Sequence, residues 1–106
     1  MNERIHQLIQ FLEEDPKDEF TRYALALEYQ KIDPHKAKEE FDYLLSNHPD
    51  YLPTYYVAAH HSIDLGDQST AEKLFIKGIE LAKAQRNQKA QMELQSAYGM
   101  WQMDQE

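Results

Sequence analysis

Residues 55–83, YYVAAHHSIDLGDQSTAEKLFIKGIELAK, contain the pattern that decides the fold of this 106-residue chain. Small and aromatic residues recur in it at helical spacing, and a related series lies 33 or 34 positions earlier. The paired positions are Arg22 and Tyr55, Leu25-Ala26 and Ala58-Ala59, Tyr29 and Ser62, Ala37 and Ala71, Phe41 and Phe75, Leu44 and Gly78, and Pro49 and Lys83. A helical repeat of this length predicts stacked helical hairpins, which bind other molecules on a face rather than in a catalytic pocket.

The composition favours helices around one core. The chain has only three glycines, no cysteine and no stretch of alternating β-branched residues, so we expect an all-α fold. Nineteen acidic and eleven basic residues give a formal charge of −8, which repels phosphate backbones and anionic lipid. We therefore expect no nucleic acid partner. The absence of cysteine excludes disulfides and thiolate metal sites.

The sequence contains no candidate membrane span. No stretch approaches the roughly 18 apolar residues that a span needs, and residues 1–15 are amphipathic and acidic, unlike a secretory signal. We therefore expect no membrane partner and a cytoplasmic location.

Capping residues and apolar spacing predict six helices. Asn2 can cap the first helix, Asp33-Pro34 can start the third, and Leu65-Gly66-Asp67 is typical of a tight turn between helices. The predicted helices cover about 3–14, 18–31, 34–47, 53–65, 67–83 and 87–101. Lys83 is followed by no clear stop signal, which leaves open whether the fifth helix continues into the sixth.

Residues 18–83 resemble the tetratricopeptide repeat, a helix-turn-helix unit of 34 residues. In the second copy Tyr55 stands at the Trp position of the pattern, Ala58-Ala59 at Leu-Gly, and Ala71, Phe75 and Gly78 at the small, aromatic and small positions. The first copy lacks the turn glycine, so it must close through Asp33-Pro34 by another geometry.

The resemblance implies an all-α superhelix of about six antiparallel helices in a single domain over residues 1–106. Its parts are a half repeat (1–16), two full hairpins (18–50 and 51–83) and a C-terminal capping helix with a tail (84–106).

In tetratricopeptide proteins the first helix of each hairpin lines a concave groove that holds a peptide or a helix of a partner. Carried over to this chain, the groove residues are Phe20, Tyr23, Ala24, Leu27 and Gln30, followed by Tyr56, Val57, His60, Ile63 and Asp64. The alternative is that Tyr23, Leu27 and Val57 only pack between helices. Some family members clamp acidic tails with Lys, Asn and Arg, but this chain has Tyr23, Leu27, Val57 and His60 at those places. An apolar or mixed ligand is expected instead.

The predicted function is a protein-interaction module with no catalysis, cofactor or bound metal, since no catalytic triad, phosphate loop or zinc motif is present. One alternative is a homodimer or larger homo-oligomer. It would pair through the apolar first-helix face or through Met100, Trp101 and Met103. Another is metal binding through His60 and His61, although two ligands are too few for a typical site.

Overall fold

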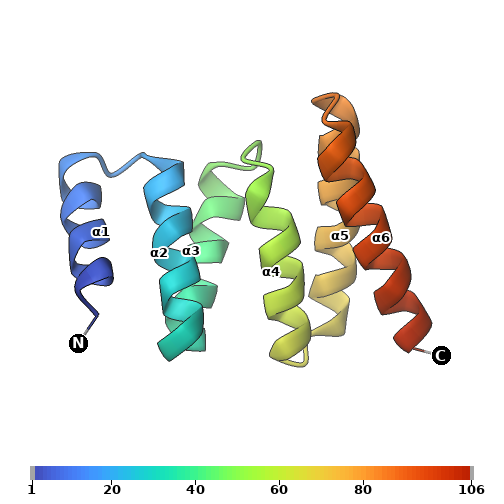
Figure 1. The fold of residues 1–106 in the computed structure, drawn as a ribbon, viewed down its shortest axis with the longest axis horizontal. Coiled ribbons are helices and arrows are strands. Elements are labelled where there is room, and N and C mark those ends of the chain that lie inside the picture. The colour runs from blue at the N-terminus through green and yellow to red at the C-terminus, as the bar shows by residue number, and fades with distance from the viewer. Residues whose placement is uncertain (1, 106) are drawn as a thin grey trace. The chain divides into compact units, whose positions relative to one another are not determined.

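The computed structural model describes residues 2–105, and all regular structure in that range is helical. The helices are α1 (Glu3–Glu14), α2 (Glu19–Ile32), α3 (Pro34–Asn47), α4 (Pro53–Asp64), α5 (Gln68–Ala84) and α6 (Gln88–Asp104), as Figure 1 shows. The all-α prediction is confirmed. The predicted bounds are close to these, except that α6 continues three residues beyond its expected end at Trp101.

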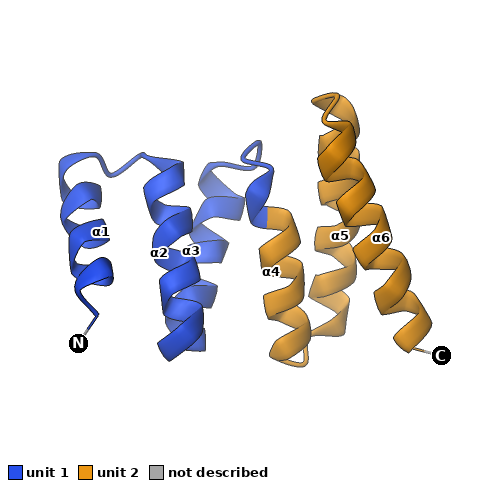
Figure 2. Ribbon diagram, in the orientation of Figure 1, with its two compact units in different colours: residues 1–54 blue, residues 55–106 orange. Residues whose placement is uncertain are grey.

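The chain divides into two compact units, residues 1–54 and residues 55–106 (Figure 2). In the first unit α2 packs against both α1 and α3. The second unit contains α5, α6 and nearly all of α4, because the boundary falls within the first turn of that helix.

The core of the first unit begins where α1 meets α2. Ile5 and Leu8 lie on one face of α1 and form a buried cluster with Leu25 of α2. Asn2 caps α1 by accepting hydrogen bonds from two backbone N–H groups of its first turn. The same side chain donates to Glu28 of α2, at 3.3 Å between Nδ2 and Oε1. The Asn2 hydrogen bond, followed by that of Lys31, lowers the pKa of the Glu28 carboxyl.

A single residue joins α2 to α3. The backbone N–H of Asp33 closes α2 by donating to Tyr29, at 2.7 Å. The carboxylate of Asp33 caps α3 by accepting from the N–H of Lys36, at 3.3 Å. Pro34 opens α3, where a missing N–H has no effect. The first hairpin thus closes without a glycine, as predicted.

The second unit is packed around α5. Phe75, Ala71 and Ala59 are fully buried. A Cβ atom added at Gly78 would lie only 2.8 Å from Cβ of Tyr55 and 3.2 Å from a methyl group of Leu94. Both α4 and α6 therefore approach α5 at this point, and only a residue without a side chain leaves room for them.

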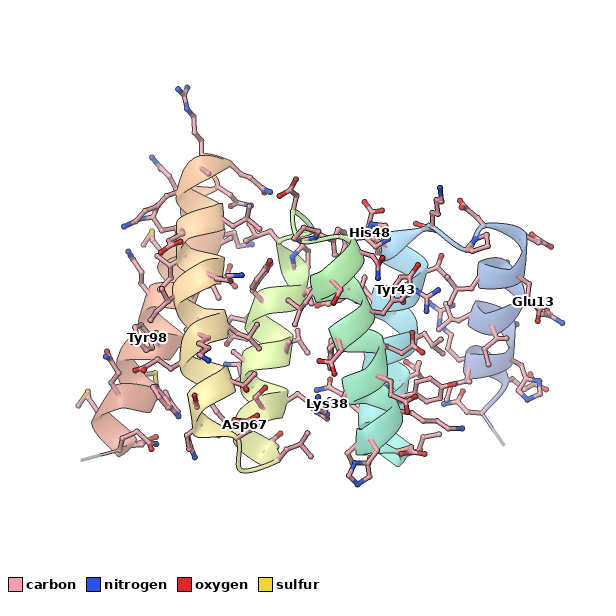
Figure 3. The ribbon with its side chains drawn as sticks, turned by 180° about the vertical axis from the view of Figure 1, so that it is seen from behind. Glu13, Lys38, Tyr43, His48, Asp67 and Tyr98 are labelled. Atoms are coloured by element: carbon pink, nitrogen blue, oxygen red, sulfur yellow. The ribbon has the colours of Figure 1, made fainter. Side chains whose placement is uncertain are left out.

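Left-handed residues end α4 and α5. Gly66 has φ of 81°, and the N–H of Asp67 reaches back to the carbonyl of Ser62 at 2.8 Å. Figure 3 labels Asp67 at this turn. Arg86 has φ of 58° and performs the same role after α5, where the N–H of Asn87 donates to Ala82 at 2.9 Å. The helix that contains Ser69 therefore ends at Ala84 and does not continue through Arg86, a question that the sequence left open.

Candidate functional site

An open groove of about 630 Å³ lies within the second unit, between α4 and α6. From α4 it is lined by Tyr56, His60 and Ile63, which share a face because they are spaced at i, i+4 and i+7. The α6 side supplies Met92, Glu93, Ser96, Ala97, Met100, Trp101 and Asp104. We call this surface the α4–α6 groove.

A cluster of rings centred on Phe75 supports the groove from behind. The fully buried Phe75 ring meets His60 edge-on at 5.7 Å, and it also contacts Tyr98 at 5.5 Å and Trp101 at 6.1 Å. His60 also contacts the ring of Tyr56, at 4.6 Å between the ring centroids. Aromatic pairs at such separations add stability beyond the area they bury. The cluster therefore fixes the positions of two lining side chains, His60 and Trp101.

Two hydrogen bonds tie α6 to α5. The indole Nε1 of Trp101 donates to Oε1 of Gln68 at 2.7 Å, and the Tyr98 hydroxyl donates to Glu72 at 3.1 Å. Burial raises the pKa of the Tyr98 phenol, and the hydrogen bond and charge of Glu72 raise it further. The phenol therefore keeps its proton at neutral pH and remains a donor. Both bonds hold the wall of the groove at a fixed rotation about the α6 axis.

The lining is mainly apolar and partly exposed. Met92 and Met100 are 69% and 66% exposed, and Tyr56 is exposed beside them. Within residues 2–105, the buried Nε2 of His60 has no hydrogen-bond partner. A buried polar atom without a partner costs free energy. The groove thus combines adaptable apolar surface with an unused hydrogen-bonding atom beneath it.

The other half of the predicted groove lies in the first unit. Tyr23 packs edge-on against Tyr51 at 5.7 Å, and burial raises the pKa of its phenol. Ala24 contacts the α1–α2 core, whereas Phe20 is exposed. Both Leu27 and Gln30 are half-buried. Tyr23 and Ala24 thus have packing roles within the unit, while a binding role for the set stays a prediction.

In the second unit, Tyr56, His60 and Ile63 of the predicted set line the groove, whereas Val57 and Asp64 do not. From the sequence, Met100 and Trp101 were expected only as a candidate surface for self-association, so α6 was not predicted as a wall of this groove. Its signal is a second stripe, Met92, Ser96 and Met100, which recurs every fourth residue beside the core stripe of the helix.

The described residues give no support to two other kinds of site. Nowhere between residues 2 and 105 do three or more His, Asp or Glu side chains gather as a metal would require. The neighbouring His60 and His61 differ in setting, since the first lines the groove and the second is buried. No helix in this range has the length and apolar character needed to cross a bilayer.

Comparison with known proteins gives no match to a protein-family model or to a curated protein. Two solved structures of a tetratricopeptide repeat domain protein from Salinibacter ruber are similar to the chain. A solution NMR structure is 40% identical with a TM-score of 0.75, covering 79% of this chain and 86% of that one. A crystal structure is 38% identical with a TM-score of 0.73, covering 76% and 92%. The chain belongs to the tetratricopeptide repeat family.

Membership confirms the resemblance of residues 18–83 to the tetratricopeptide repeat. The periodic positions of the tetratricopeptide pattern, Ala26, Ala37, Phe41, Ala59, Ala71 and Phe75, are all buried, so the repeat register is structural. The tetratricopeptide repeat is a non-catalytic interaction scaffold, and the chain is therefore a protein-interaction module in this general sense.

Proposed function

We propose that the α4–α6 groove binds a segment of a partner protein. The observation that carries this proposal is an apolar, open groove whose exposed side chains lie on a fixed aromatic support. Tyrosine and tryptophan are favoured anchors at protein interfaces because they bury large areas at low entropic cost. Exposed methionines adapt to the shape of an incoming side chain. Tyr56 and Trp101 supply the anchors, and Met92 and Met100 supply the adaptable surface.

A matched pair of substitutions on α6 tests the proposal. Met100 lines the groove, whereas Met103 is 72% exposed and lies outside it. Met100→Asp should abolish capture of partners from an extract of cells that produce the chain, since it places a charge in the apolar contact. Met103→Asp introduces the same charge one turn away and should retain capture. Equal capture by both variants, or equal loss, contradicts the proposal.

Replacing two tyrosines separates binding from packing. Tyr56→Ala should weaken capture and lower the melting temperature only modestly, because the side chain is exposed at the groove and loses one ring contact, with His60. Tyr23→Ala removes a ring that packs on Tyr51, so it should lower the melting temperature. Circular dichroism melts alongside the capture experiment distinguish the two effects.

A homodimer is the second candidate, favoured by the exposed side chains of Met92, Met100 and Met103 along α6. Light scattering gives the mass in solution directly. A dimer that Met103→Asp converts to a monomer supports this candidate. A monomeric wild-type chain at about 100 μM excludes it for affinities in the micromolar range.

A further inference from the structure

The charged side chains that line the α4–α6 groove are all acidic. Glu93 and Asp104 are the carboxylates, and neither Lys nor Arg is among the lining residues. No ion pair or hydrogen bond within residues 2–105 engages either carboxylate, although Lys89 lies one helical turn before Glu93. Both charges are therefore available to an occupant of the groove.

The two carboxylates have a defined spacing. Glu93 and Asp104 are eleven positions apart on α6, which corresponds to about three turns and about 16 Å along the axis. At 100° per residue they differ by only about 20° around the helix, so they share one face. Between them the same wall presents Ser96, Ala97, Met100 and Trp101. The order along the groove is thus acid, mainly apolar, acid.

The environment of each carboxylate strengthens its attraction for a cation. Asp104 is the last residue of α6, where the helix dipole adds negative potential and the final turn contains no basic residue. The rings of Trp101 and Tyr56 offer faces on which a guanidinium or ammonium group can stack. A formal charge of −8 also steers basic segments toward the whole chain.

From this complementarity we infer that the occupant is a basic amphipathic helix of a partner protein. It has two Lys or Arg residues about three turns apart, pairing with Glu93 and Asp104, and an apolar face between them that contacts Met100 and Trp101. This inference rests on the proposed binding function and specifies the chemistry of the ligand. Helices that present an apolar stripe to a groove are a common mode of peptide recognition.

The test uses a synthetic peptide and the single tryptophan of the chain. The peptide is a helix of about 18 residues with two lysines at the same eleven-position spacing and leucines between them on one face. Trp101 lines the groove and is the only tryptophan, so its fluorescence reports occupancy. Binding of the lysine peptide should shift the emission of Trp101, whereas the same peptide with glutamates in place of the lysines should not.

Isosteric variants test the two carboxylates. The double change Glu93→Gln with Asp104→Asn should weaken the lysine peptide about 3- to 30-fold, the range expected for losing two exposed ion pairs. Adding salt to about 0.5 M should lower the affinity of the wild-type chain for the lysine peptide by a similar factor, and that of the double variant by less. Glu80→Gln is the matched control, because Glu80 is an exposed acid of α5 outside the groove.

The outcomes separate this inference from the function on which it rests. Equal binding of the lysine and glutamate peptides, an unchanged affinity in the double variant, or no response of Trp101 to the lysine peptide overturns the inference. The groove itself is judged by the Met100→Asp and Met103→Asp comparison. If only Met100→Asp loses capture while the charge experiments fail, the groove binds a partner of other chemistry.

Discussion

The two hairpins fill the same position of the repeat in opposite ways. In the first unit the position is occupied by Arg22, whose guanidinium donates to Glu40 at 2.8 Å and lies 3.8 Å over the ring of Tyr43. In the second unit it is occupied by the buried Tyr55, whose Cβ would lie 2.8 Å from a Cβ atom added at Gly78. One unit thus uses a partly buried ion pair where the other uses a buried tyrosine in close contact with a glycine.

The two hairpins also differ at the repeat position that Gly78 occupies. Where the second copy places the large Tyr55 opposite Gly78, the first copy has a buried leucine, Leu44, at the position of the glycine. The Arg22 side chain of the first copy is only 18% exposed, and the Glu40 side chain that pairs with it is 17% exposed. Arg22 and Leu44 are together larger than Tyr55 and Gly78, so residue volume is not preserved between the two copies at these positions.

The largest expected effect comes from Phe75, at the centre of the aromatic cluster. Phe75→Ala should lower the free energy of unfolding by about 3 to 5 kcal/mol, the usual range for a buried phenylalanine. The corresponding change in the first unit, Phe41→Ala, should fall in the same range, because Phe41 is also almost fully buried. Urea unfolding of both variants provides the measurement. A loss below about 3 kcal/mol for Phe75→Ala would contradict the role assigned to the cluster.

Gly78→Ala should have the next largest effect. The added methyl group would collide with Tyr55 and Leu94, so overpacking should reduce stability by about 1 to 3 kcal/mol. Gly99→Ala is the matched control within α6, where an added Cβ meets nothing within 4 Å. That change should raise stability by about 0.5 to 1 kcal/mol through helix propensity. Thermal unfolding should show lower stability for Gly78→Ala and higher stability for Gly99→Ala. A change of the same sign in both variants would contradict the close approach at Gly78.

The ion pair of the first unit should contribute less than the ring contacts of the second. A double-mutant cycle with Arg22→Met and Glu40→Gln should give a coupling of about 1 kcal/mol, because the pair is only partly shielded from water. The coupling should fall as salt is added. A coupling near zero would show that Arg22 acts through its stacking on Tyr43 alone.

The smallest expected effect lies in the turn between α5 and α6. Arg86 has a left-handed backbone, which a residue with a Cβ adopts at a cost. Arg86→Gly should therefore raise stability by up to about 1 kcal/mol. Gly66→Ala, at the equivalent place after α4, should lower it by a similar amount. Melting temperatures that move in the same direction for both would rule out a shared turn geometry.

The sequence predicted the helices well because its capping residues act locally. Asn2, Asp33 and Asp67 each bond to backbone groups within a few positions, so their effect is independent of distant packing. The end of α5 at Ala84 was predicted to within one residue, at Lys83, but the left-handed turn that follows was not. Arginine is an uncommon left-handed residue, so Arg86 gives no signal comparable to Gly66.

The candidate site was predicted only in part for a related reason. Tyr56 and His60 were found through their place in the repeat. Met100 was expected only as a surface for self-association, and Met92 was not singled out. Which side of α6 faces the groove is set by long-range contacts such as Trp101 with Gln68. Spacing along one helix cannot reveal a hydrogen bond to another.

The single-residue link at Asp33 has a consequence for how the chain can be opened or engineered. Since one residue terminates α2 and starts α3, straightening it removes both caps at once, and the two helix ends should exchange their amide hydrogens together. The link has no slack for an inserted loop. The three-residue link around Gly66 is the better place for a tag, a permuted terminus or a guest sequence.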